Sequence, residues 1–266
     1  MSFKHIVSRD NPVFKQLKKL ADNARERRSE GKTLLDGVHL IEAYIAAFGE
    51  SGLELVIIPE GRSSVEATGM IQALEHVASI MLPTLMFAEL TPVVSATGIL
   101  ALVKIPQLTV PGQATFALML EDIQDPGNLG SMVRTAAAAG VEVVYLSAGC
   151  TDAWSPKALR GGQGAQFVLP IVERANLVTQ LQNFKGKSFA TSMQGESLYA
   201  QDLTQATAFV IGNEGAGLRN QTVAAATKCI TIPMVESKRG SVESLNAGAA
   251  TAVCLFERMR QILIYS

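Results

Sequence analysis

The sequence predicts an α/β protein with a mainly parallel sheet and helices on both faces in its C-terminal half. Short apolar runs alternate with segments of helical periodicity along the chain, which is the pattern of βα units. The apolar runs show little polar alternation, so each strand is expected to be buried on both faces, as in parallel sheets. At 266 residues, with 48% hydrophobic and 18% charged residues, the chain is long enough for one large or two ordinary domains and too apolar for extensive disorder.

A smaller α/β domain is expected over residues 1–105. A polar helix over residues 11–30 comes first, with Pro12 suited to its first turn. Extended and helical signals then alternate. The strands are expected at residues 33–36, 53–58, 80–82 and 99–105, and the further helices at 38–48, 65–77 and 88–94. Residues 106–113 contain two prolines and a glycine, so they are expected to form the linker to a second domain.

The second domain is expected over residues 114–266, where the same alternation resumes. Its strands are expected at residues 116–121, 141–146, 188–191, 209–211 and 229–232, and its helices at 129–139, 176–184, 218–226 and 244–264. Polar residues and glycines directly follow three of its apolar runs. An α/β sheet presents its strand ends to ligands at such places, so the three segments are expected to line one pocket.

Basic residues are concentrated at the N-terminus. Residues 1–32 contain nine Lys or Arg against four acidic residues, whereas the rest of the chain contains 14 basic and 20 acidic residues. Such a segment indicates contact with a polyanion, because neutralising phosphates releases counterions and supplies most sequence-independent nucleic-acid affinity. A solvated helix face is the alternative interpretation. The candidate RNA-binding residues are Lys18, Lys19, Arg25, Arg27, Arg28 and Lys32.

Cysteine and histidine usage argues against several kinds of site. Cys150, Cys229 and Cys254 are odd in number and widely spaced, which supports neither a disulfide framework nor a zinc site, so no metal is expected. All three histidines lie in the first 80 residues, which excludes a Ser-His-Asp arrangement confined to the C-terminal half. The start lacks the apolar core of a signal peptide and no run approaches 18 apolar residues, so a cytoplasmic location is expected.

The first polar segment, DPGNLG from Asp125 to Gly130, follows the first strand of the second domain. It is a turn that leads into a helix, with Asn128 as a good N-cap residue. A well-built βα turn is the simple interpretation. Arg134 lies in the otherwise apolar helix that follows, and a guanidinium in that place is expected to bind a phosphate or a carboxylate.

The second segment, IGNEGAGL from Ile211 to Leu218, is rich in glycine. It lacks both the Gly-Lys-Ser/Thr of a P-loop and the glycine spacing of a dinucleotide-binding turn. Its glycines would still let backbone groups approach a flat ligand closely, and Glu214 places a carboxylate among them. A purely structural turn is the alternative interpretation.

The third segment begins with IPM at Ile232 and reaches, after a polar loop, SLN from Ser244 to Asn246. Ser244 and Asn246 are placed at or near a helix N-terminus, where such side chains either cap the helix or face a ligand. Capping alone is the simpler explanation of Ser244. The small residues at 247–252 would allow this helix to approach another backbone closely.

Together the three segments resemble the motifs of the SpoU (TrmH-like) family of RNA ribose 2′-O-methyltransferases, within the SPOUT class. The matching stretches are DPGNLGSMVRTAAAAG at residues 125–140, FVIGNEGAGL at 209–218, and residues 232–250. The resemblance extends over residues 116–260. The N-terminal part, through residues 27–40, looks like the family's ribosomal-protein-like substrate-binding domain.

The resemblance implies a trefoil knot in the C-terminal domain, a rare exception to the unknotted rule, and a homodimer formed through that domain. S-adenosylmethionine is expected to bind in a bent conformation among the three loops. The implied cofactor-binding residues are Thr191, Met193, Gly212, Ile232 and Leu245.

The resemblance also implies methyl transfer to a ribose 2′-oxygen, with Arg134 at the 2′-hydroxyl. A free guanidinium has a pKa of about 12.5 or more, so two roles stay open for Arg134: a base activated by a substrate phosphate, or a fixed cation that orients the hydroxyl and stabilises the developing alkoxide. The catalytic residues carried over from the matching motif positions are Asn128, Arg134, Glu214, Ser244 and Asn246.

The sequence therefore predicts S-adenosylmethionine-dependent 2′-O-methylation of a ribose in structured RNA. Ribosomal RNA is favoured because two-domain relatives of this kind commonly act there, and transfer RNA is the alternative substrate. A non-catalytic RNA-binding protein on the same fold is the alternative function, since the loop at residues 235–243 is longer than is usual in the family. A nucleotide-hydrolysing protein is disfavoured because no Walker lysine is present.

Overall fold

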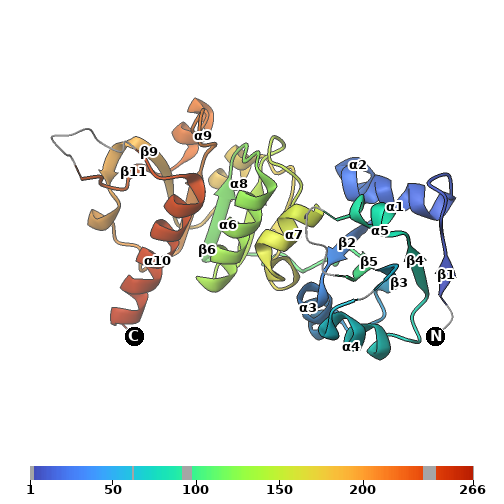
Figure 1. The fold of residues 1–266 in the computed structure, drawn as a ribbon. Helices are drawn as coiled ribbons and strands as arrows, with labels where there is room; N and C mark the ends of the chain where they lie inside the picture. The colour runs from blue at the N-terminus through green and yellow to red at the C-terminus, as the bar shows by residue number, and fades with distance from the viewer. Residues whose placement is uncertain (1–2, 62, 92–97, 236–243, 266) are drawn as a thin grey trace. The chain divides into compact units, whose positions relative to one another are not determined.

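The protein divides into two compact units in a computed structural model. The structure describes residues 3–61, 63–91, 98–235 and 244–265. Unit 1 comprises Met1–Gln107 and Trp154–Phe167, and unit 2 comprises Leu108–Ala153 and Val168–Ser266. Each unit has its own β-sheet, and the two sheets are described separately (Figure 1).

Unit 1 contains a five-stranded mixed sheet in the order β1-β4-β3-β5-β2. β1 and β3 are parallel to β4, whereas β5 is antiparallel to both β2 and β3. Its strands are β1 (Lys4–His5), β2 (Lys32–Asp36), β3 (Leu53–Pro59), β4 (Ser79–Leu82) and β5 (Leu100–Lys104). Its helices include α1 (Pro12–Asp22), α2 (Ala24–Glu30), α3 (Val38–Phe48), α4 (Val65–Ala73) and α5 (Thr84–Ala88). β1 was not among the predicted strands.

The helix predicted over residues 11–30 is two helices, because Asn23 interrupts it. The backbone of Asn23 is extended, at φ −121° and ψ 113°, and its side chain caps α2 by accepting a hydrogen bond from the Arg25 amide at 2.8 Å. Asn favours such capping over a helix interior. The helix predicted at residues 88–94 was also misplaced: α5 precedes it, and residues 92–97 lie outside the described part of the chain.

Unit 1 also takes in a segment from between two strands of unit 2. This segment forms α7 (Pro156–Gly162) and the short 3₁₀ helix η1 (Ala165–Phe167), where the sequence predicted no element. Thr33 Oγ1 donates to the Trp154 carbonyl at 2.6 Å, and the Phe167 ring meets the Tyr44 ring edge to face, with centroids 5.5 Å apart. The core of unit 1 therefore depends on residues from the second half of the chain.

Unit 2 contains a six-stranded sheet in the order β11-β9-β10-β6-β7-β8, and every pairing in it is parallel. The strands are β6 (Phe116–Leu120), β7 (Val143–Leu146), β8 (Ile171–Val172), β9 (Lys187–Ser197), β10 (Thr207–Ile211) and β11 (Lys228–Thr231). Every residue of β6 and β10 is buried. The prediction of a mainly parallel sheet is therefore confirmed, and burial on both faces holds for the central strands β6 and β10 but not for β8, β9 and β11.

Helices cover both faces of the unit 2 sheet. Ala117 and Met119 of β6 pack in one apolar cluster with residues of α8 (Leu177–Asn183) and α9 (Asn220–Ala225). Phe116 points to the opposite face, since side chains alternate along a strand. On that face the Cζ atom of Arg258, on α10 (Ala247–Tyr265), lies 4.0 Å from the centroid of the Phe116 ring. α10 also packs against α6 (Pro126–Ala138). In the described part of the chain, no helix is long and apolar enough to cross a membrane.

Candidate functional site

The polar segments of unit 2 gather where its central strands end. β6 and β10 are parallel neighbours, so the loops that follow them lie at the same edge of the sheet. A direct hydrogen bond joins these loops, because Asn213 Nδ2 donates to the Asp122 carbonyl at 2.9 Å. The turn that leads into the first segment is thus in contact with the second segment.

The first segment is capped differently from the prediction. α6 begins at Pro126, and Asp125 is its N-cap residue, accepting a hydrogen bond from the Asn128 amide at 2.8 Å. Pro126 suits the first helical position because a backbone N–H is not needed there. Asn128 was therefore wrongly identified as the N-cap, and its side chain remains available for another partner.

The second segment folds into a tight loop around the Asn213 side chain. Asn213 Oδ1 accepts from the amides of Gly215, at 2.8 Å, and Ala216, at 3.1 Å. Gly212 must be glycine because a Cβ there would lie 2.5 Å from the Gly217 carbonyl carbon. Gly217 has φ +67°, in the left-handed region that favours glycine. These contacts fix the position from which Glu214 projects.

One carboxylate oxygen connects all three segments. Glu214 Oε1 accepts from Asn128 Nδ2 at 2.9 Å and from the Ala247 amide at 3.4 Å. Asn128 belongs to the first segment, Glu214 to the second, and Ala247 opens the helix that follows the third. The structure therefore brings together three regions that are separated by more than 30 residues in sequence.

Asn246 acts as the cap of α10. Its Oδ1 accepts from the Ala249 amide at 2.7 Å, and its carbonyl accepts from the Ala250 amide. The helix consequently begins at Ala247, three residues later than predicted. Ser244 is exposed, and the preceding residues 236–243 lie outside the described part of the chain.

Arg134 lies on the solvent-exposed side of α6, six residues after Asn128. The inward side of the same helix buries Leu129, Met132 and Val133. Among the residues that the structure describes, Arg134 forms no hydrogen bond and no ion pair. Its guanidinium is therefore available to bind an anionic or hydroxyl-bearing ligand.

The residues expected to hold the cofactor lie on or after the neighbouring strands β9, β10 and β11. β9 pairs with β11 through Ala190 and then again through Glu196, so the stretch 191–195 bulges out between two stretches of pairing. Thr191 Oγ1 donates to the Val210 carbonyl at 3.1 Å, whereas 65% of the Met193 side chain is exposed. Gly212 and Ile232 are half-buried and Leu245 is exposed. Exposed apolar side chains and accessible backbone groups at one sheet edge suit a flat, partly apolar ligand.

The thiols show no sign of being nucleophiles. Burial raises the pKa of Cys254 to about 12 and also raises the pKa of Cys150, so both remain protonated at neutral pH. In the ranges that the structure describes, no group of three or more His, Cys, Asp or Glu side chains could hold a metal ion.

The predicted RNA-binding residues differ in availability. Arg27 is 3% exposed, and its guanidinium donates to the carbonyls of Leu20 and Ala21. These bonds hold the end of α1 against α2. The prediction that Arg27 is an RNA-binding surface residue is therefore wrong. Lys18 pairs with Asp22 and Lys32 pairs with Glu54. The exposed residues with no side-chain partner in the described part of the chain are Lys19, Arg25 and Arg28.

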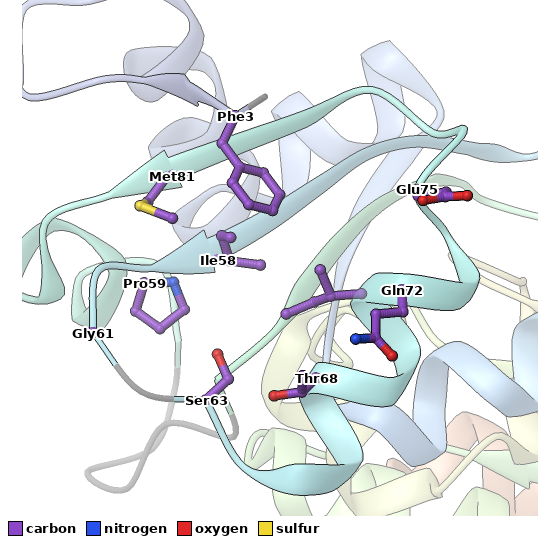
Figure 2. Close-up of a pocket in the computed structure, with 10 residues that line it drawn as sticks. Phe3, Ile58, Pro59, Gly61, Ser63, Thr68, Gln72, Glu75 and Met81 are labelled. Carbon is purple, nitrogen blue, oxygen red and sulfur yellow. The ribbon is translucent and has the colours of Figure 1, made fainter. Parts of the chain in front are cut away.

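Unit 1 also has an open hollow of about 690 Å³ beside β3, β4 and α4 (Figure 2). Phe3, Ile58 and Met81 give it an apolar wall, and Glu75 is its only charged lining residue among those described. The described lining residues therefore offer no cation to a polyanion.

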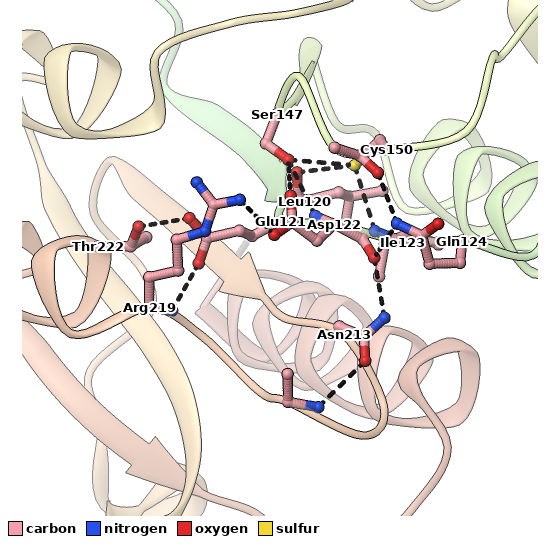
Figure 3. A network of polar contacts seen from close by, with 12 residues as sticks. Leu120, Glu121, Asp122, Ile123, Gln124, Ser147, Cys150, Asn213, Arg219 and Thr222 are labelled. Carbon is pink, nitrogen blue, oxygen red and sulfur yellow. Dashed lines mark hydrogen bonds and ion pairs between the residues drawn. The ribbon is translucent and has the colours of Figure 1, made fainter.

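Sequence reasoning missed a polar network at the same edge as Glu214 (Figure 3). It is built from Glu121, Asp122, Ser147, Arg219 and Thr222. The signal that could have revealed it was the pair of acidic residues at the end of a fully apolar strand, because buried carboxylates require partners.

A family model described as "SpoU rRNA Methylase family" matches residues 115–256. The 23S rRNA (guanosine(2553)-2′-O)-methyltransferase RlmP of Bacillus subtilis is 32% identical, over 95% of this chain and 98% of its own length. An uncharacterised tRNA/rRNA methyltransferase of Synechocystis is 33% identical, over 96% of this chain and 93% of its own length.

A solved structure shares the fold over nearly the whole chain. It is the SpoU methyltransferase AviRb of Streptomyces viridochromogenes, in complex with the cofactor AdoMet. The match has a TM-score of 0.82 and 25% identity, and it covers 95% of this chain and 98% of that one. The similarity therefore includes both units and not only the segment matched by the family model.

Proposed function

Because the chain belongs to the SpoU rRNA methylase family, we propose that it transfers a methyl group from S-adenosylmethionine to the 2′-oxygen of a ribose in ribosomal RNA. The relative named RlmP is a 23S rRNA guanosine 2′-O-methyltransferase, and it aligns over almost its whole length. The observation that carries the proposal is the bridge from Glu214 to Asn128 and Ala247, because it assembles the three motifs into one site. A cytoplasmic protein is part of the same proposal.

The residues present fit the cofactor. Met193 and Leu245 offer exposed apolar surface, which suits an adenine, and the half-buried Gly212 adds no side chain beside them. With Thr191 and Ile232, these residues would hold S-adenosylmethionine. Once bound, the cofactor supplies an electrophilic methyl group on a sulfonium.

Arg134 is the proposed group at the ribose 2′-hydroxyl. In the reaction an O–C bond forms at the 2′-oxygen, the S–C bond breaks, and the hydroxyl loses its proton. Arg134 contributes either by accepting that proton with help from a substrate phosphate or by orienting the hydroxyl and stabilising the developing alkoxide. Asn128, Glu214, Ser244 and Asn246 would position the arginine, the phosphate and the ribose around it.

The RNA is proposed to contact α1 and α2 through Lys19, Arg25 and Arg28, with weaker contributions from Lys18 and Lys32. Lys18 already pairs with Asp22 and Lys32 with Glu54. Each lysine would therefore have to leave its carboxylate in order to bind a phosphate. Arg27 is left out of the proposed contact because its guanidinium is committed to backbone carbonyls.

A homodimer through unit 2, and a trefoil knot in that unit, complete the proposal. Phe256 and Ile264 are exposed on α10, and exposed apolar side chains on one helix favour association. Phe256→Glu should therefore convert dimers into monomers in sedimentation velocity. A monomeric wild-type protein at micromolar concentration would overturn the dimer.

The test of the function is to map ribose 2′-O-methyl groups in total RNA from cells with and without the gene. The proposal expects loss of one methyl group from ribosomal RNA. Loss from a transfer RNA would support the alternative substrate, and an unchanged methylation map would contradict the proposed reaction.

A further inference from the structure

Asp122 connects the loops that follow three neighbouring strands (Figure 3). Its carboxylate accepts from Ser147 Oγ, after β7, at 2.8 Å and from Arg219 Nη2, after β10, at 2.6 Å. Its amide donates to Ser147 Oγ at 2.9 Å, and its carbonyl accepts from Asn213 Nδ2 at 2.9 Å. Asp122 thus uses both its backbone and its side chain as a junction at this edge of the sheet.

The backbone of Asp122 adopts a conformation that requires support. Its φ is +56°, in the left-handed region that L-residues other than glycine visit rarely and at an energetic cost. Such outliers persist only when surrounding contacts hold them, and they cluster at functional sites. Here the hydrogen bonds to Ser147, Asn213 and Arg219 provide that support.

Arg219 is itself fixed by the neighbouring acid. Glu121 is 3% exposed and accepts from the Arg219 amide at 2.8 Å and from Thr222 Oγ1 at 2.6 Å. These two bonds anchor the start of α9, so the guanidinium of Arg219 extends from a fixed backbone position towards Asp122. Both ends of the glycine-rich loop, Asn213 at its start and Arg219 just beyond it, are therefore tied to residues 121 and 122.

Glu214 projects from within that loop. Asn213 Nδ2 donates to the Asp122 carbonyl, and Asn213 Oδ1 accepts hydrogen bonds from the amides of Gly215 and Ala216. The backbone on both sides of Glu214 is therefore restrained. Glu214 in turn holds Asn128 and the start of α10. Asp122 and Glu214 are therefore linked through Asn213 and the backbone of the glycine-rich loop.

We propose that the Asp122–Arg219 ion pair is a positioning pair for methyl transfer: it sets the glycine-rich loop so that Glu214 holds Asn128 and α10 in the reactive arrangement. The catalytic part of this inference rests on the proposed function, whereas the loop positioning does not. Misplacing reacting groups by about 1 Å costs on the order of 100-fold in rate, so partial loosening of the loop is expected to cost about ten-fold.

The test compares Asp122→Asn with Glu89→Gln. Asn tolerates a positive φ and can still accept from Ser147, so the variant mainly removes the charge that Arg219 binds. Glu89 forms an ion pair with Arg9 of the same 2.6 Å length and similar side-chain exposure, 62% and 32% against 56% and 25%. Glu89→Gln therefore reports the cost of losing an ordinary surface ion pair.

Two readouts are measured: the single-turnover rate at saturating RNA and S-adenosylmethionine, and the hydrogen exchange of the Gly215, Ala216 and Gly217 amides. Asp122→Asn should lower the rate about ten-fold, keep the cofactor Kd within about threefold, and accelerate exchange of these amides. Glu89→Gln should change neither. Arg219→Gln should lower the single-turnover rate as much as Asp122→Asn does. The double variant Asp122→Asn/Arg219→Gln should be no slower than either single variant. Arg219→Lys, which keeps the positive charge, should retain part of the rate.

Unchanged exchange together with an unchanged rate in Asp122→Asn would overturn the proposal, as would losses that multiply in the double variant. A lower melting temperature with the wild-type rate would also contradict it, because that result describes a purely structural pair. If the wild-type protein transfers no methyl group while Asp122→Asn still accelerates exchange, the proposed function fails and the positioning of the loop stands.

Discussion

The edge of the unit 2 sheet and the α1–α2 surface of unit 1 treat charged residues in opposite ways. At the sheet edge, Glu121 and Asp122 are bound by groups of the turn that starts α9. On α1 and α2, Lys19, Arg25 and Arg28 are exposed and have no side-chain partners among the described residues. The charges at the sheet edge hold loops in place, whereas these three cations on α1 and α2 are left without side-chain partners.

This difference follows from what each region is proposed to do. Catalysis needs groups held in one geometry before the reaction begins, whereas binding of a polyanion needs cations that can replace counterions along its backbone. Arg134 combines the two conditions, because it belongs to the rigid helix α6 and yet has no partner in the part of the chain that the structure describes. Substituting Arg134 is therefore expected to have the largest effect on methyl transfer.

Arg134→Ala should have the largest effect, a fall of at least about 100-fold in methyl transfer, because removing one group that stabilises a transition state costs about 100- to 1,000-fold. The Kd for S-adenosylmethionine should stay within about threefold, since Arg134 lies on α6 and the proposed cofactor residues lie on other elements. Single-turnover kinetics and calorimetry give the two values. Arg134→Lys keeps a cation at this position and should retain part of the activity, while normal turnover by Arg134→Ala would remove Arg134 from the mechanism.

Asn128→Asp should have the next largest effect. It replaces the amide that donates to Glu214 at 2.9 Å with a second carboxylate, and two carboxylates at that distance repel each other. The repulsion raises the pKa of the pair, so the loss should be greatest at high pH and should lessen as pH falls and one carboxyl becomes protonated. A pH–rate profile tests this sign, with Asn128→Ser as the uncharged control. A pH-independent loss would contradict the role of the Asn128–Glu214 contact.

Replacing Lys19, Arg25 and Arg28 with Gln should weaken RNA binding without impairing chemistry. Each lost phosphate contact is expected to reduce the slope of log K against log salt by roughly 0.7 to 0.9, so the triple variant should lose about two units of slope. Filter binding at several salt concentrations measures the slope, and the rate at saturating RNA serves as the control. An unchanged slope would remove this surface from the RNA contact.

Arg27→Ala should have a smaller effect, and of a different kind. The Arg27 side chain is buried and bonded to two carbonyls, so its loss should lower the free energy of unfolding by about 2 kcal/mol. Thermal unfolding measures this loss, while the salt slope of RNA binding should stay that of the wild type. A reduced slope with wild-type stability would place Arg27 on the RNA surface after all.

The sequence was sufficient to predict the parallel sheet and the three motifs, because both are local signals. The apolar runs of β6 and β10 predicted strands buried on both faces. The polar residues behind them predicted which loops meet at the ends of these strands, and the ligand site there stays a prediction. The assignment of Asn128 as a cap failed for a local reason too. Asp125 competes for the same role, and the proline at position 126 favours a helix that starts one residue after Asp125.

The remaining features depend on contacts that are distant in sequence. The burial of Arg27 follows from the break at Asn23, which turns α2 so that the guanidinium reaches the end of α1. The segment 154–167 packs into unit 1 through contacts with Thr33 and Tyr44, more than 100 residues away. The partnership of Asp122 with Arg219 joins residues 97 positions apart. No periodicity or motif spacing encodes such pairings.

Methyl transfer by the purified protein tests the proposed 2′-O-methylation of ribosomal RNA most directly. The protein is incubated with deproteinised ribosomal RNA from cells that lack the gene and with S-adenosylmethionine carrying a labelled methyl group, and the RNA is then hydrolysed in alkali. A ribose 2′-O-methyl group blocks cleavage of the adjacent phosphodiester, so label is expected in an alkali-resistant dinucleotide with the wild type, and no such label is expected with Arg134→Ala. Label released in mononucleotides, or equal labelling by wild type and Arg134→Ala, would contradict it.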